Sequence, residues 1–151
     1  MYTVALIEPQ IPPNTGNIAR LCAATNMELV VVGQLGFPWS DRHLKRAGMD
    51  YWEFVRIRYE PDFNRFLRSL TMERTYFLTT KTERAYTEIE PQRGDTFLFG
   101  SETSGLPGWL LKAYPDSCLT IPMPNPNVRS LNLATSCGIV MYHMLAQAGF
   151  E

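Results

Sequence analysis

Five short runs of apolar, mostly β-branched or aromatic residues constrain the fold of this chain more than any other feature, and a sixth run, 54–59, alternates like a half-exposed strand. The run Leu-Val-Val-Val at 29–32 contains no polar residue that could face solvent, as expected of a strand covered on both sides. Longer segments with helical spacing separate these runs. Strands that alternate with helices predict an α/β fold with a mainly parallel sheet covered by helices on both faces. The expected strands are 2–8, 29–32, 54–59, 75–80, 96–100 and 118–123.

Helix boundaries follow from capping residues and from glycine or proline at the ends. Asn14 or Thr15 is expected to cap the first helix, in which Ile18 and Cys22 belong to the buried stripe and Arg20 lies off it. Ser40 can cap a short helix that ends near Gly48. The other expected helices are 62–70, 107–114 and 130–149.

The last of these helices is apolar almost all the way round. Its main stripe comprises Ala134, Cys137, Gly138, Met141, Leu145 and Ala148, and Ile139, Val140 and Met144 widen it. A helix on the surface of a monomer should keep a polar side. Burial against both the sheet and a second subunit is therefore expected, with complete burial inside one subunit as the alternative.

With 151 residues, of which 45% are hydrophobic, the chain is expected to form one domain over 1–151 without an appended RNA-binding domain. We expect a cytoplasmic protein that is not attached to a membrane, because no signal peptide and no apolar stretch of ~20 residues is present. The three cysteines lack the spacing of a zinc site, and buried thiols are expected. A net charge of −1 argues against nucleic-acid binding by bulk charge alone.

Three loops that follow strands are rich in Gly, Pro and Asn, and these loops are 12–17, 100–108 and 122–132. Ligands of open α/β sheets bind outside the carboxyl ends of the strands, so the loops predict one shared site. The middle loop has the Gly spacing of a P-loop, but Leu106 and Pro107 stand where Lys and Ser or Thr would bind phosphate. A nucleoside triphosphate is therefore not expected. Neither a nucleophile motif nor a set of metal ligands is found, and the expected chemistry uses no metal.

Taken together, the three loops resemble the motifs of the SPOUT superfamily of RNA methyltransferases. Asn14-Thr-Gly-Asn-Ile-Ala-Arg-Leu-Cys22 is similar to the first motif, Phe99-Gly-Ser-Glu-Thr-Ser-Gly-Leu-Pro107 to the second, and 121–136 to the third. The segment 37–53 is similar to the small members that methylate the ribose of the tRNA wobble nucleotide.

This resemblance implies a deep trefoil knot in the C-terminal part, S-adenosylmethionine bound in it, and a homodimer. It also implies transfer of a methyl group to the 2'-hydroxyl of cytidine or uridine 34 in the anticodon stem-loop of tRNA, with S-adenosylhomocysteine as the product. By position in the motifs, the cofactor contacts are expected from Leu78, Gly100, Glu102, Ile121, Ser130 and Leu131.

Methyl transfer to a hydroxyl depends mainly on the placement of the reactants. Arg20 is expected to bind the phosphate of the target nucleotide and to orient its 2'-hydroxyl, and Asn14, Ser130 and Asn132 are expected to help at the same centre. Helix capping is the structural alternative for Ser130 and Asn132. RNA contacts are expected from Arg42, Lys45, Arg46 and Tyr142, and Tyr51 and Trp52 could stack on an unpaired base.

Two other functions remain open at this level. A non-catalytic, flavodoxin-like module could bind nucleotides or RNA without binding S-adenosylmethionine tightly. The enzyme could also methylate ribosomal RNA or a different position of tRNA, because specificity depends on surface shape.

Overall fold

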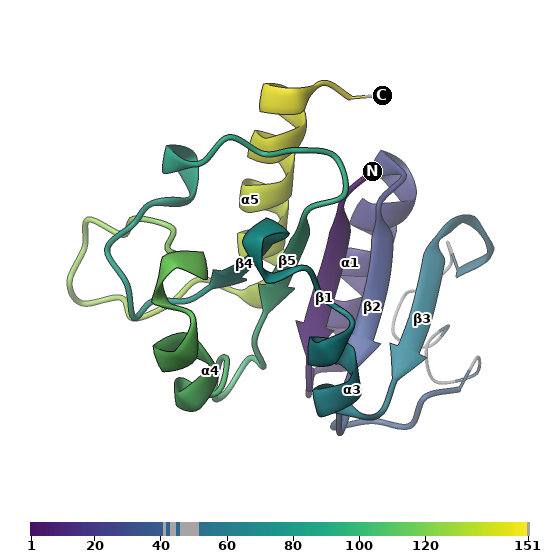
Figure 1. The fold of residues 1–151 in the computed structure, drawn as a ribbon. Coiled ribbons are helices and arrows are strands. Elements are labelled where there is room, and N and C mark those ends of the chain that lie inside the picture. The colour runs from purple at the N-terminus through teal and green to yellow at the C-terminus, as the bar shows by residue number, and fades with distance from the viewer. Residues whose placement is uncertain (41, 43–44, 46–51, 151) are drawn as a thin grey trace.

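The computed structural model describes residues 1–40, 42, 45 and 52–150. Its centre is a six-stranded sheet in the order β3-β2-β1-β5-β4-β6, and all of its pairings are parallel (Figure 1). The α/β class with a parallel sheet that the sequence predicted is confirmed. The strands are β1 (Thr3–Ile7), β2 (Glu28–Val32), β3 (Arg56–Glu60), β4 (Thr75–Leu78), β5 (Thr96–Phe99) and β6 (Cys118–Leu119).

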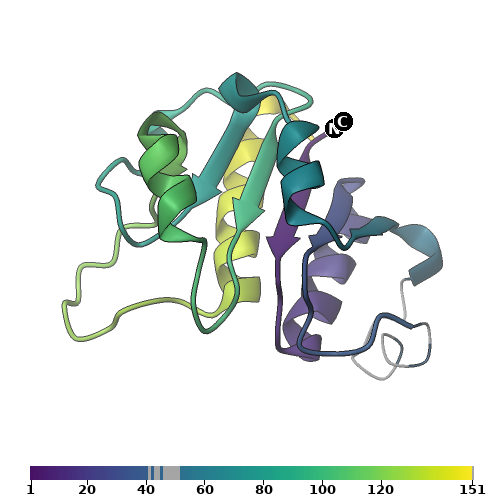
Figure 2. The same cartoon turned by 60° about the horizontal axis from the view of Figure 1, so that its bottom comes forward.

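Helices cover both faces of this sheet, as Figures 1 and 2 show from two directions. One layer consists of α1 (Pro12–Thr25) and α5 (Leu133–Ala148), which pack against each other. The opposite layer consists of the shorter helices α3 (Phe63–Arg68) and α4 (Gly108–Ala113). Single turns of 3₁₀-helix are η1 (Trp52–Phe54), η2 (Met72–Arg74), η3 (Tyr86–Glu88) and η4 (Pro115–Ser117).

Alternation of side chains along the strands divides the core into two clusters. Val4 and Leu6 of β1 point into the cluster with α1 and α5, whereas Ala5 and Ile7 point into the cluster with α3 and α4. All four side chains are buried, so β1 is covered on both faces. The apolar runs of the central strands have this two-sided burial as their physical cause, whereas the edge strand β3 is half-exposed.

Two helices begin at other residues than the sequence predicted. The N-cap of α1 is Ile11, and Pro12 and Pro13 occupy the first two helical positions, so the prediction of Asn14 or Thr15 as the cap is wrong. Proline suits this place because its φ is already helical and no N–H is left without a partner. Helix α5 begins at Leu133 rather than at residue 130, because the Asn132 side chain accepts a hydrogen bond from Thr135 N (3.1 Å). The short helix expected after Ser40 lies largely outside the described residues.

Helix α5 is buried on one side only. Its buried side chains include Cys137, Val140 and Met144, whereas Ile139 and Tyr142 are 36% and 48% exposed. The three cysteines of the chain are free and buried, as the sequence predicted. Burial raises the pKa of the Cys22 thiol to about 12 and that of the Cys137 thiol well above its ordinary value.

Among the described residues, no helix combines the length and the apolar composition that crossing a membrane requires.

Candidate functional site

The start of α1 is fixed by a carboxylate from the middle loop. Glu102 accepts hydrogen bonds from the backbone N–H groups of Gln10 (2.9 Å) and Ile11 (2.8 Å) and from Asn14 Nδ2 (3.2 Å). Its negative charge also lies at the positive end of the helix dipole. The Pro-rich corner before α1 is thereby tied to the loop after β5.

The loop after β5 turns back on itself directly after the strand. A Cβ atom on Gly100 would lie 2.1 Å from the carbonyl carbon of Gly105, so only glycine fits at position 100. Gly105 itself has a φ of +67°, and its N–H donates to Ser101 O (3.0 Å). The Ser101 hydroxyl lies 2.8 Å from that of Ser104 and accepts a hydrogen bond from the Ser104 N–H (3.1 Å). The two glycines are thus required by the compact turn itself.

The loop between β6 and α5 returns to the same place. Asn132 Nδ2 donates to Asn14 Oδ1 (3.1 Å), while Asn132 Oδ1 caps α5. Glu102, Asn14 and Asn132 therefore form one hydrogen-bonded series that joins all three loops. The capping role considered for Asn132 is confirmed, and the convergence of the three loops predicted from the sequence is confirmed as well.

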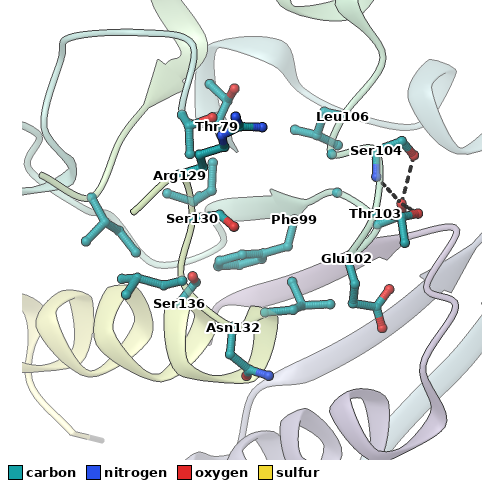
Figure 3. A pocket seen from close by; sticks show the side chains of 18 of the residues that line it. Thr79, Phe99, Glu102, Thr103, Ser104, Leu106, Arg129, Ser130, Asn132 and Ser136 are labelled. Carbon is teal, nitrogen blue, oxygen red and sulfur yellow. Dashed lines mark hydrogen bonds between the residues drawn. The ribbon is translucent and has the colours of Figure 1, made fainter. Parts of the chain in front are cut away.

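These loops enclose a cavity of about 570 Å³ at the carboxyl ends of β4 and β5 (Figure 3). Phe99 lies at its centre in Figure 3, the loop 102–106 forms one wall and the segment 129–132 forms another. A volume of this size is typical of sites for cofactors and other small molecules. Many of the lining residues have the short side chains of Gly, Ser or Thr, so a ligand there would meet many backbone groups.

Two cations line this cavity that the sequence reasoning did not assign to the site. Lys81 follows β4 by three residues, and Arg129 precedes Ser130 in the third loop. Both side chains are exposed. The residues around Lys81 and Arg129 carry no local pattern that indicates a binding site. Lys81 lies shortly after a strand, and Arg129 lies in a part of the third loop without Gly or Pro. Only their place next to the convergent loops could have indicated them.

Among the described residues, no three or more His, Cys, Asp or Glu side chains gather as ligands for a metal ion.

The pattern of the SpoU rRNA methylase family matches residues 1–142. The chain belongs to this family. A relative from Escherichia coli K12, tRNA (cytidine(34)-2'-O)-methyltransferase, is 42% identical over 151 residues that cover 99% of this chain and 96% of the relative. The same name is given to a relative from Yersinia pestis, which is 42% identical over 99% of this chain and 96% of its own.

Solved structures with a similar fold cover nearly the whole chain. One of them, described as giving structural insights into the 2-OH methylation of C/U34 on tRNA, has a TM-score of 0.89 and 38% identity, and the match covers 100% of this chain and 98% of that one. An AdoMet-bound rRNA methyltransferase from Sinorhizobium meliloti has a TM-score of 0.81 and 25% identity, over 96% of this chain and 56% of that one.

All of the predicted cofactor residues line the cavity of this SpoU family member. They are Leu78, Gly100, Glu102, Ile121, Ser130 and Leu131. Of the residues predicted to act at the reacting centre, Asn14, Ser130 and Asn132 line it too. Ser130 lies in the loop before α5, not in its first turn as expected.

Arg20 is not brought to the cavity of its own chain. It lies on the exposed side of α1, six residues beyond Asn14, which is about 9 Å further along the helix axis. The predicted RNA-binding residues Arg42, Lys45 and Tyr142 are exposed. Arg46 and Tyr51 lie outside the described residues, as does the Trp52 side chain.

Proposed function

We propose that this SpoU family member transfers a methyl group from S-adenosylmethionine to the ribose 2'-hydroxyl of nucleotide 34 in tRNA, where the nucleotide is cytidine or uridine. The observation that carries the proposal is the full-length identity of 42% to tRNA (cytidine(34)-2'-O)-methyltransferase. The cavity at the carboxyl ends of the strands supplies a matching place for the reaction.

The residues around the cavity fit S-adenosylmethionine. Leu78, Ile121 and Leu131 offer apolar walls for an adenine ring, and the tight turn at Gly100 presents backbone groups. Ser130 can donate to a hydroxyl or a carboxylate of the cofactor. Glu102 takes part through the loops it holds, since its oxygens already accept three hydrogen bonds. When bound, the cofactor supplies a methyl group activated by a sulfonium.

The chain's own contribution to the reaction is positioning. Asn14 and Asn132 hold the corner of α1 against the start of α5, so both walls keep a fixed separation before the substrate arrives. Arg20 is proposed to bind a phosphate of the target nucleotide and to orient the 2'-hydroxyl. Its guanidinium stabilises negative charge that develops on the oxygen, while the proton leaves late in the reaction.

A homodimer through α5 is part of the proposal. Ile139 and Tyr142 form an exposed apolar strip on this helix, and a Cβ atom at Gly138 would meet no atom beyond its chain neighbours and the backbone of its own helix within 4 Å. Such a strip is more typical of a contact surface than of a surface in water. Since α1 packs beside α5, a partner on this face would also lie near Arg20.

The anticodon stem-loop would then contact exposed basic residues outside the cavity. Arg42 and Lys45 are proposed to bind its phosphates, with Arg46 as the third member of the predicted basic group. Tyr142 is proposed to reach either the RNA or the dimer contact. Phosphate contacts of this kind should make binding weaker at high salt.

The proposed trefoil knot is consistent with the path of the chain. Strand β6 pairs with the outer edge of β4, and the chain then returns through a wide loop to α5, which packs on α1 (Figure 2). We also propose that residues 1–151 form a single domain and that the protein acts in the cytoplasm.

The decisive experiment is mass mapping of the methylated nucleotide in tRNA from cells with and without this protein. Loss of the 2'-O-methyl group at position 34 alone supports the function. Loss of a methyl group from ribosomal RNA or from a different tRNA position, with nucleotide 34 unchanged, would refute it.

A further inference from the structure

A second cavity of about 240 Å³ lies beside the first and shares six of its residues, among them Lys81, Ser101 and Ser104. Glu8 and Gln10, which follow β1, line only this second cavity. The loop after β5 separates the two spaces, and Lys81 contacts both. A ligand too large for the first cavity could therefore extend into the second across Lys81.

Glu8 is held in an unusual backbone conformation. Its φ is +52°, in the left-handed region that residues with a side chain rarely adopt. Its N–H donates to Val32 O (2.8 Å) and its carbonyl accepts from Gln10 Nε2 (2.7 Å). Neighbouring backbone and side-chain groups therefore maintain the strain.

The loop after β2 makes room for the Glu8 side chain. A Cβ atom on Gly33 would lie 2.7 Å from Glu8 Cγ, so glycine at position 33 is what allows the carboxylate to lie there. Glu8 Oε2 accepts from Gln34 N (2.9 Å). Among the described residues, no hydrogen bond engages Oε1. One oxygen is thus fixed by the protein and the other is available to a ligand.

The cavity therefore offers a carboxylate acceptor and an ammonium donor. Lys81 makes no ion pair within the part of the chain that the structure describes. The edge of cytosine carries an amino group, N4, and a carbonyl oxygen, O2, which match these two groups. Uracil keeps O2 but has an acceptor, O4, in place of the amino group, so a carboxylate would repel it.

We propose that the second cavity receives the base of the target nucleotide, with Glu8 accepting a hydrogen bond from N4 of cytosine and Lys81 donating to O2 of either pyrimidine. The ribose then lies over the shared wall, with its 2'-hydroxyl toward the first cavity. Glu8 favours cytidine over uridine, whereas Lys81 binds both alike. This inference rests on the proposed function and extends it to the choice of base.

The test uses the full-length protein and two tRNA transcripts that differ only in C or U at position 34. Single-turnover methylation at saturating cofactor gives a cytidine-to-uridine rate ratio for each variant. Glu8→Gln keeps the shape, and its amide can turn to donate to uracil O4, so the ratio should fall about tenfold. Lys81→Met should slow both substrates to a similar extent and leave the ratio unchanged.

Glu73→Gln is the matched control, because Glu73 is exposed on η2, which precedes β4 at the opposite end of the sheet. Melting temperature should be similar in all of the variants, and the affinity for S-adenosylhomocysteine should be similar in wild type, Glu8→Gln and Glu73→Gln. A wild-type enzyme that methylates neither transcript at position 34 would refute the proposed function. An active wild type that favours uridine, a Glu8→Gln ratio within about twofold of wild type, or a loss of cofactor affinity in Glu8→Gln without a change in ratio would overturn the inference alone.

Discussion

Removing the Glu102 carboxylate should loosen all three loops of the site at once. Glu102→Ala leaves two backbone N–H groups, those of Gln10 and Ile11, without their acceptor, and it removes one bond from Asn14. A hydrogen bond to a charged group contributes about 1.5–3 kcal/mol. Because Glu102 is partly exposed, we use the lower value for the two short bonds and a negligible one for the longer bond, which gives about 3 kcal/mol.

For a chain of this length, about 3 kcal/mol corresponds to a fall in melting temperature of about 6–12 °C. Glu102→Gln should lose about half as much, since an amide has one acceptor oxygen for two N–H donors. The measurement is thermal unfolding followed by circular dichroism at fixed protein concentration, combined with calorimetry of S-adenosylhomocysteine binding. Binding of the cofactor should weaken together with stability, because the same loop forms the cavity wall.

Glu73→Ala serves as the control, since Glu73 is exposed and lies away from the cavity. It should melt within about 1 °C of wild type, as most surface substitutions do. If Glu102→Ala melts together with this control, the carboxylate does not stabilise the corner of α1. If it melts lower but binds the cofactor normally, the loops do not depend on the hydrogen-bonded series for their shape.

Arg20→Ala should slow single-turnover methylation about 10²–10³-fold at saturating cofactor, and Arg20→Lys should recover only part because an ammonium lacks the planar fork; a rate near wild type would exclude the role. Gly138→Arg should fold, because space is open at this position, and should sediment as a monomer; a persistent dimer would place the interface elsewhere. A hydrogen bond from Arg65 is the main cause that lowers the Glu60 pKa from 4.5 to about 2, so the carboxylate stabilises the fold above pH 4.5 and loses this effect as the pH falls toward 2. The difference in melting temperature between wild type and Glu60→Gln should therefore shrink over that range, and a constant difference would contradict the assignment. The three buried cysteines should react with a thiol reagent at pH 8 only after unfolding, and fast labelling of the native protein would contradict their burial.

The central strands and the α/β class could be predicted because burial on both faces leaves a local mark in the sequence, and the half-exposed edge strand β3 could be predicted from the alternation of its residues. The start of α1 could not, since the group that accepts hydrogen bonds at this corner, Glu102, is 91 residues away from Ile11. The start of α5 was missed by three residues for a local reason. Asn132 caps the helix, whereas Ser130, two residues earlier in the same loop, has a side chain with the same capping chemistry.

The convergence of the loops was predictable from their composition and from the rule that ligands bind at the carboxyl ends of strands. The roles of Lys81 and Glu8 were not, because their proximity depends on the strand order. Only when β5 lies between β1 and β4 do the ends of these strands form one wall. Helical spacing predicted correctly that Arg20 is exposed, but spacing alone could not give its distance from the cavity.

The pairing of β1 with β5 has a consequence for the synthesis of this protein on the ribosome. Thr3 pairs with Thr96, so 93 residues must be added after Thr3 before this side of β1 finds its neighbour. At about 5–20 residues per second, this edge of β1 stays without a partner strand for roughly 5–20 s. During that time β2 can already pair with the other edge of β1, and β3 can pair with β2. An apolar strand with an open edge invites pairing with another nascent chain. We therefore expect rapid translation of the segment 61–99 to increase the soluble yield, and slow codons within it to increase aggregation.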